Sequence, residues 1–263
     1  MVTAAFLDRY RDADSPLHRA DARVKLVTAF GYILAISFTR SGDWGVLAML
    51  ALPLLGLAAA SRLGVMSLVR RTFLALPFLA AAFPLLFTTP GAPILVVPVL
   101  GWDIAREGVT LLATIVARSW LAVGAGVLLV STTPVAELLR ASRALGVPAV
   151  LVSTLFFAYR YAFVIGDEAQ RMLRARTSRS AALDGRRAGG SLRWRIGVAG
   201  SMVGSLFARS LERSDRIFAA MQARGYAGEI LLLEPPREGA TGILGGATLV
   251  TYGALVQLLA RLA

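Results

Sequence analysis

Two arginines near the ends of predicted helices are the residues of this chain whose type and spacing could do chemistry. Residues 208–226, ARSLERSDRIFAAMQARGY, carry an apolar stripe at alternating spacings of four and three, which is typical of an amphipathic helix. The stripe comprises Phe207, Leu211, Phe218 and Met221, with Ser214 between them. Gly225 stands where a helix end favours positive φ, so Arg224 is predicted on the last turn. Upstream, DEAQRMLRARTSR places Arg176 near the end of another predicted helix.

A guanidinium presents a planar fork of donors that fits a carboxylate, so the two arginines could each anchor to an acidic groove on another protein. The alternative is a solvated arginine that interacts with the helix dipole, and residue chemistry alone favours that alternative. The Ala-Arg pair is not rare here, because it also occurs at 22–23, 105–106, 117–118 and 208–209. Only the pairs at 175 and 223 follow a predicted amphipathic helix and stand at its end.

The remaining reactive side chains do not form a catalytic or metal-binding set. The chain has no cysteine, which excludes disulfides, thiolate metal sites and cysteine nucleophiles. Its single histidine, His18, lies in an arginine-rich segment and cannot build a transition-metal site alone. Four carboxylates are predicted to neutralise adjacent arginines: Asp167, Glu168, Glu212 and Asp215. With no phosphate-binding glycine loop either, we expect no cofactor, no metal and no ATP hydrolysis by this chain alone.

The composition indicates a polytopic helical membrane protein, because 56% of the 263 residues are hydrophobic. The 28 basic residues, all arginine except Lys25, give a net charge of +12. Nucleic-acid binding is disfavoured, since aromatic residues are not interleaved with the basic ones and the apolar content is too high. No signal peptide is evident in the polar N-terminal segment.

We expect an all-α fold with about five transmembrane helices and a cytoplasmic region of long amphipathic helices. The predicted spans are 24–39, 44–60, 73–89, 108–130 and 240–262. Residues 91–103, GAPILVVPVLGWD, are predicted to be a loop. Arg118 lies inside the fourth span, where an ionisable residue is a functional candidate. We favour packing against carbonyls or a partner helix over a contact with a substrate-binding subunit.

The arginines predict the orientation, because cytoplasmic flanks carry the excess of basic residues. The N-terminal flank, the second loop and residues 131–229 are all basic, so the N-terminus is expected in the cytoplasm. The predicted domains are a four-span membrane domain at 1–130, a cytoplasmic region at 131–229 and a C-terminal span at 230–263.

The cytoplasmic region is predicted to be helical. TTPVAELLRASRALGVP reads as a short helix with Thr133 as N-cap and Gly146 after its end. Residues 150–179 read as one long helix, and 180–195, SAALDGRRAGGSLRWR, as a loop. Small residues dominate 196–207 and would let another helix approach closely. They are Gly197, Gly200, Ser201, Gly204 and Ser205.

Together these segments resemble the transmembrane T component of energy-coupling factor (ECF) transporters, in particular the CbiQ family associated with cobalt uptake. The resemblance is carried by LDRYRDADSPLHRADARVKL at 7–26, STTPVAELLRASRALGVP at 131–148, FAYRYAFVIGDEAQRMLRARTSR at 157–179 and SDRIFAAMQARGY at 214–226. In that family each cytoplasmic coupling helix ends in an X-Arg-X signature that docks on an ATPase subunit. The corresponding residues here are Ala175, Arg176 and Thr177, and Ala223, Arg224 and Gly225.

The resemblance implies a scaffold that couples ATP hydrolysis by two partner ATP-binding cassette subunits to uptake of a metal ion, most simply cobalt. A separate membrane subunit would bind the substrate, and the location would be the bacterial cytoplasmic membrane. A general T component that serves vitamin or nickel uptake is the alternative. An ordinary ABC permease fits less well, because it couples through one helix per subunit, and an intramembrane enzyme would need a catalytic constellation that is missing here.

Overall fold

The computed structural model describes residues 15–61, 64–73, 82–97, 102–179, 191–226, 228, 248–249, 251–253 and 255–258. The chain divides into two compact units, which are described separately. The bundle unit comprises residues 10–145 and 235–263, and the helix-pair unit comprises 146–234 with 1–9. This division differs from the predicted domain boundaries in assigning residues 131–145 to the bundle unit, and it does not test which parts lie in a membrane.

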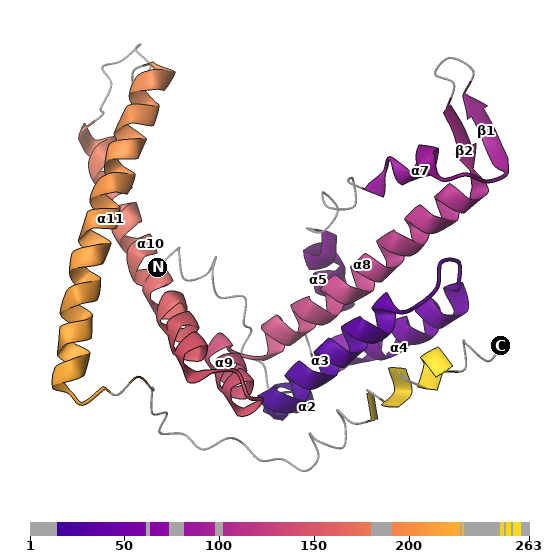
Figure 1. Cartoon of the computed structure of the whole chain (residues 1–263), viewed down its shortest axis with the longest axis horizontal. Helices are drawn as coiled ribbons and strands as arrows, with labels where there is room; N and C mark the ends of the chain where they lie inside the picture. The colour runs from indigo at the N-terminus through magenta and orange to yellow at the C-terminus, as the bar shows by residue number, and fades with distance from the viewer. Residues whose placement is uncertain are drawn as a thin grey trace. The chain divides into compact units, whose positions relative to one another are not determined.

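Helices dominate both units (Figure 1), as expected of an all-α membrane protein. The bundle unit contains α2 (Pro16–Arg19), α3 (Ala22–Ser37), α4 (Trp44–Ala60), α5 (Val65–Thr72), α7 (Leu85–Thr88), α8 (Arg106–Thr132) and α9 (Val135–Ala144). The helix-pair unit contains α10 (Ala149–Arg179) and α11 (Leu192–Ala223). By length and composition α8 and α10 could each cross a membrane, and α4 is a shorter apolar helix.

The core of the bundle unit lies between α3, α4, α5 and α8, whose apolar side chains pack against one another. Its buried hydrophobic side chains are Tyr32, Ile36, Leu47, Leu50, Leu54, Ala58, Leu68, Leu121, Ala125, Leu128 and Val256. Gly124 of α8 permits close packing, since a Cβ there would lie 3.0 Å from Leu54 Cδ2. The buried hydroxyl of Tyr32 donates to the backbone oxygen of Leu50, which satisfies its one polar group.

Pro53 interrupts the hydrogen bonding of α4, because it has no N–H to donate to the carbonyl of Met49. The hydroxyl of Tyr252, from the C-terminal segment, donates to that oxygen at 3.1 Å. A second contact comes from Gln257, whose Nε2 donates to Ala35 O at 2.7 Å. The C-terminal segment therefore satisfies backbone carbonyls of both α3 and α4. Most of the predicted span at 240–262 lies outside the described residues.

The junction of α8 and α9 differs by one residue from the prediction. Pro134, and not Thr133, is the N-cap of α9, because α9 begins at Val135 and Pro134 is the non-helical residue directly before it, while Thr133 closes α8. The ammonium of Lys25 donates to Thr132 O at 3.3 Å and to Thr133 Oγ1 at 3.2 Å. Thr133 is thus occupied by a contact to α3. The predicted end of α9 is confirmed, since Gly146 has φ 98°.

The predicted loop at 91–103 contains a β-hairpin, which corrects the interpretation of that segment. Strands β1 (Pro93–Val97) and β2 (Trp102–Ala105) pair antiparallel, with an irregular register between Pro93 and Leu95. The prolines of this segment are loop signals, whereas the Ile-Leu-Val-Val run between them favours a strand. Of the predicted span at 73–89, residues 74–81 lie outside the described residues, and the remainder contains only the short α7.

Candidate functional site

The two arginine-bearing helices α10 and α11 form an antiparallel pair, side by side in Figure 1. Three contacts join them in opposite chain order. Trp194 near the start of α11 meets Arg176 near the end of α10, and Arg209 meets Glu168 in the middle. Tyr226, just after α11, meets Phe157 near the start of α10. The single long helix predicted at 150–179 is confirmed, and α11 begins at Leu192, within the segment predicted as a loop.

Glu168 links the middle of the pair through two arginines. Its carboxylate accepts from Arg171 on the same helix at 2.7 Å and from Arg209 on α11 at 2.9 Å. The hydrogen bond from Arg171, with that from Arg209, holds the pKa of Glu168 below its ordinary value, although partial desolvation opposes the shift. This confirms the prediction that Glu168 neutralises neighbouring arginines.

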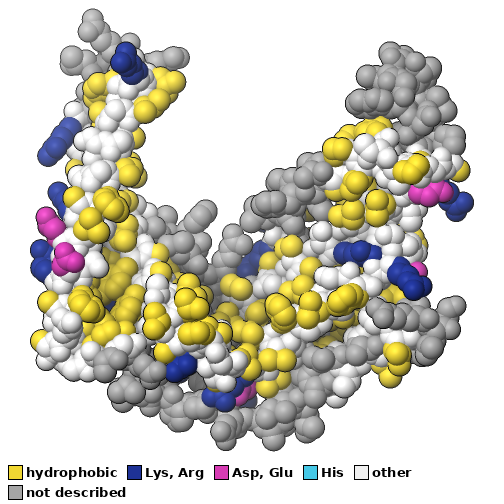
Figure 2. Space-filling model, viewed as in Figure 1, with side chains coloured by type: hydrophobic (Ala, Val, Ile, Leu, Met, Phe, Trp, Pro, Cys, Tyr) yellow, Lys and Arg dark blue, Asp and Glu magenta, His cyan; other side chains and the backbone are white. Residues whose placement is uncertain are grey.

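The half-buried apolar face of α11 shares only Met221 with the predicted stripe. The half-buried apolar positions are Val198, Met202, Leu206, Ile217 and Met221. The neighbouring positions Phe207, Leu211 and Phe218 are 65%, 53% and 53% exposed. Hydrophobic side chains are accordingly visible on the surface of this unit in Figure 2. The sequence pattern found an apolar helix face correctly, but α11 has two such faces and spacing alone does not say which one packs.

Arg224 is the C-cap of α11 in a Schellman motif. The N–H of Gly225 donates to Gln222 O at 2.9 Å, and the N–H of Tyr226 donates to Met221 O at 3.0 Å. Gly225 has φ 81°, which confirms the predicted positive-φ position. Arg224 is exposed, and its guanidinium has no hydrogen-bonding or ion-pair partner among the described residues.

Arg176 has a different environment, inside the last turn of α10. Its guanidinium carbon lies 5.9 Å from the ring centroid of Trp194, and the side chain is half-buried. Thr177 is still helical, and its hydroxyl donates to Arg174 O at 2.8 Å. Ser191 begins α11 as its N-cap, since its Oγ accepts from the backbone N–H of Trp194 at 3.3 Å.

The antiparallel pairing places the two arginines at opposite ends of the helix pair. At the usual helical rise, Phe157 and Arg176 lie about 28 Å apart along α10, and Phe157 marks the level of the Arg224 end. The two guanidinium groups are therefore well separated along the helix pair. The structure therefore does not bring the two predicted tripeptides into one site but keeps them apart.

His18 and Arg118 are both engaged in structural contacts. The Nδ1 of His18 lies 2.7 Å from Ser15 Oγ. Within the described ranges, no group of three or more His, Cys, Asp or Glu side chains lies where it could hold a metal ion. A guanidinium nitrogen of Arg118 donates to the carbonyl of Thr39 just after α3, which confirms the predicted packing against a carbonyl. Its Nε is buried without a partner in the described part of the chain.

Three aromatic residues that hold the helix pair were missed by the sequence reasoning: Phe157, Trp194 and Tyr226. Tyr226 carried a usable signal, because the residue after a C′ glycine commonly makes an apolar contact. Phe157 lies in the aromatic run of residues 156–163, where no spacing rule distinguishes it. Trp194 was hidden in the segment interpreted as a loop.

Comparisons with known proteins identify the family of this chain. The profile of the CbiQ family, described as "Cobalt transport protein", matches residues 13–232. The cobalt transport protein CbiQ of Rhodobacter capsulatus is 30% identical over 178 residues, 67% of this chain and 70% of the relative. Energy-coupling factor transporter transmembrane proteins EcfT are also similar. The one from Heliobacterium modesticaldum is 26% identical over 87% of this chain and 86% of its own length, and the one from Thermanaerovibrio acidaminovorans is 29% identical over 85% and 84%.

These findings and the apolar helices define a membrane component of a transporter. Because the family profile covers most of the sequence, the chain belongs to the CbiQ family of cobalt transport proteins. The EcfT relatives support a T component of an ECF transporter, which works in a complex with other subunits.

Proposed function

We propose that this chain is the energy-coupling scaffold of an ECF-type importer, and that its helix pair transmits ATP hydrolysis by two partner ATPases to the membrane. The observation that carries this proposal is the position of Arg176 and Arg224 at opposite ends of the antiparallel α10–α11 pair. Ala175–Arg176–Thr177 would dock on one ATPase and Ala223–Arg224–Gly225 on the other. The chain itself would hydrolyse nothing.

The chemistry of docking is a charge-assisted hydrogen bond from each guanidinium to carboxylates in a groove. The exposed Arg224 loses its hydration on docking, so the groove must supply acceptors in return. A rigid connection between the two ends supports coupling, because movement of one ATPase would shift the other end of the same element. The Glu168 link to Arg209 and Arg171 contributes to that connection.

Cobalt is the proposed cargo, on the strength of the family and of the CbiQ relative in Rhodobacter capsulatus. A separate membrane subunit would bind the ion, consistent with the structural contacts of His18. The second candidate is a general T component that serves vitamin or nickel uptake, which the EcfT relatives favour. Uptake of labelled cobalt, nickel and vitamins by cells that express the complete transporter distinguishes these cargoes.

The proposed location is the bacterial cytoplasmic membrane, with five spans and the N-terminus inside. Because the natural chain has no cysteine, single cysteines test this topology without background labelling. We expect Arg140→Cys to be modified only from the cytoplasm and Ala92→Cys only from outside. The length of α10 allows a competing topology in which this helix crosses the membrane. Modification of Ser178→Cys from outside would establish that topology and contradict ours.

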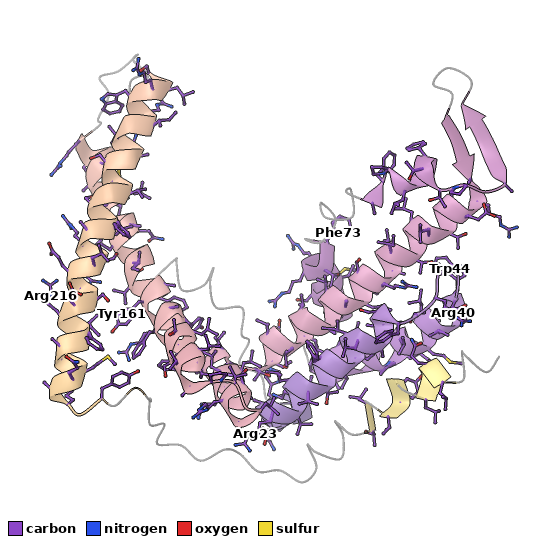
Figure 3. All side chains as sticks on the ribbon, in the orientation of Figure 1. Arg23, Arg40, Trp44, Phe73, Tyr161 and Arg216 are labelled. Carbon is purple, nitrogen blue, oxygen red and sulfur yellow. The ribbon has the colours of Figure 1, made fainter. Side chains whose placement is uncertain are left out.

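The proposed coupling is tested by ATP-dependent uptake together with capture of the ATPases. We expect the Arg176→Glu/Arg224→Glu double variant to lose both, since like charges would face each other at each groove. Arg216→Ala is the matched control, because Arg216 is an exposed arginine on α11 away from its end (Figure 3). Normal uptake and capture by the double variant would refute the coupling role.

A further inference from the structure

Tyr226 lies two residues beyond Arg224, just outside the proposed docking tripeptide at 223–225. Its backbone N–H completes the Schellman motif through Met221 O at 3.0 Å. Its ring packs edge-on against Phe157 of α10, with centroids 6.4 Å apart and an interplanar angle of 71°. One residue therefore joins the end of α11 both to its own last turn and to the neighbouring helix.

Phe157 is the centre of a larger aromatic cluster on α10. It stacks on Tyr161 with centroids 6.3 Å apart, and it meets Phe156 edge-on at 6.4 Å. Tyr226 is the residue of this cluster that comes from the end of α11, and both Tyr226 and Phe157 are half-buried. The cluster therefore provides an aromatic surface on α10 against which Tyr226, just after the end of α11, packs.

The end of a helix is ordinarily the part that frays, because its last carbonyls lack helical partners. Arg224 stands at such an end and is exposed, and no described side chain holds its guanidinium. The direction in which the Arg224 side chain points is consequently set by its backbone. That backbone lies inside the turn closed by the hydrogen bond from Tyr226 N–H to Met221 O. A group that is ordered before docking loses less conformational freedom on binding.

We infer that Tyr226 is a positioning residue for Arg224: its ring, held on the Phe157 cluster of α10, fixes the end of α11 so that the exposed guanidinium is presented in one orientation. This inference rests on the proposed docking of Arg224. The side chain of Tyr226 acts through the backbone of the last turn and need not touch the partner. The geometry assigns the role to the ring and not to the hydroxyl, since the contact with Phe157 is between rings.

The first test measures positioning without any partner. Spin labels on Thr154→Cys of α10 and Gln222→Cys of α11, both exposed positions, report the distance across this end of the pair in the full chain. Tyr226→Ala and Phe157→Ala should each broaden the distance distribution, and Tyr226→Phe should leave it narrow. Phe163→Ala is the matched control, because Phe163 packs edge-on against Tyr159 of its own helix. An unchanged distribution in Tyr226→Ala would overturn the inference.

The second test measures docking in the assembled transporter. Single cysteines at Gln222 and Ser178 report cross-linking to the ATPases at the Arg224 end and the Arg176 end respectively. Tyr226→Ala should lower cross-linking at Gln222→Cys about threefold to tenfold, the range expected for one aromatic pair, and leave Ser178→Cys unchanged. Tyr226→Phe should restore the wild-type value.

The two tests separate failure of the inference from failure of the proposed function. If neither cysteine cross-links to an ATPase in the chain that keeps Tyr226, the docking role itself is wrong. If both cross-link and Tyr226→Ala changes neither, docking stands and the positioning role is wrong. An equal loss at both cysteines in Tyr226→Ala would show a general folding defect and would also contradict a role confined to the Arg224 end.

Discussion

The two arginine-bearing ends of the helix pair share the Ala-Arg sequence but not the local structure. At the end of α10, Arg176 and Thr177 are both helical, and the guanidinium lies over Trp194. At the end of α11, Arg224 is the C-cap and Gly225 turns the chain at φ 81°. The same tripeptide pattern therefore provides one arginine that is held by its side chain and one that is held by its backbone.

This difference indicates what each neighbour of the arginine contributes. Gly225 is required by its backbone conformation, and a Cβ there would meet no other atom within 4 Å. Thr177 has no such requirement, because its hydroxyl only donates back to its own helix. The shared element is thus the arginine, while the third position follows the local geometry of each helix end.

Reversing the charge at either end should give the largest effect. We expect Arg224→Glu and Arg176→Glu each to weaken ATPase binding by about 2–5 kcal/mol, the cost of leaving buried carboxylates unpaired. The comparison is sharpened by thermal unfolding of the isolated chain. Both substitutions place a carboxylate at the unfavourable end of a helix dipole, but only Arg176→Glu also loses the Trp194 contact, so it should lower the unfolding temperature more than Arg224→Glu does. Equal unfolding temperatures for the two variants would contradict the difference between the ends.

Substitution at the third position of the tripeptide should affect only the Arg224 end. Gly225→Val should cost about 1–2 kcal/mol, because a β-branched residue is strained at positive φ, and uptake should fall. Gly225→Asn should be milder, since asparagine tolerates this conformation. At the other end, Thr177→Ala should be close to wild type in the same uptake measurement. A loss in Gly225→Asn as large as in Gly225→Val would instead indicate that the groove contacts this position directly.

Removal of the Trp194 ring should have a smaller effect, confined to the Arg176 end. An exposed cation–π contact is worth about 0.5–1 kcal/mol, so Trp194→Ala should reduce cross-linking at Ser178→Cys a few-fold. Trp194→Phe keeps an aromatic face and should lie between Trp194→Ala and the wild type. Cross-linking at Gln222→Cys is the control and should not change in either variant.

The smallest effect concerns the middle of the pair, between the two ends. Because the pKa of Glu168 is lowered in the folded chain, its ionised form contributes stability above the unfolded value of about 4.3. That contribution is lost as the pH falls through the lowered folded pKa. The contribution of Glu168 to stability should therefore be constant between pH 7 and 5. Thermal unfolding of the wild type should therefore lose stability below about pH 4 relative to Glu168→Gln. If the unfolding temperatures of the wild type and Glu168→Gln changed with pH in the same way, Glu168 would not link α10 to α11.

Helix positions were largely predictable from local sequence, whereas contacts between distant segments were not. Trp44–Ala60 was predicted to the residue, because Asp43 and Ser61 bound an uninterrupted apolar run. Gly225 and Arg224 were placed correctly because a helix end has a local signature. The apolar stripe did not identify the face of α11 that packs, since that face depends on where α10 lies. The role of Thr133 likewise depends on Lys25, which is remote in the sequence.

The hydrogen bond between Tyr252 and Met49 has a consequence for the order in which the protein is made. The two residues are 203 positions apart, so α4 emerges from the ribosome long before its missing donor exists. At about 5–20 residues per second, the interval is about 10–40 seconds. During that time the carbonyl left open by Pro53 lacks this partner, and an unpaired backbone carbonyl is costly wherever water is excluded. The hydrogen bond between α4 and the C-terminal segment can therefore form only after residue 252 has been made, late in the synthesis of the chain.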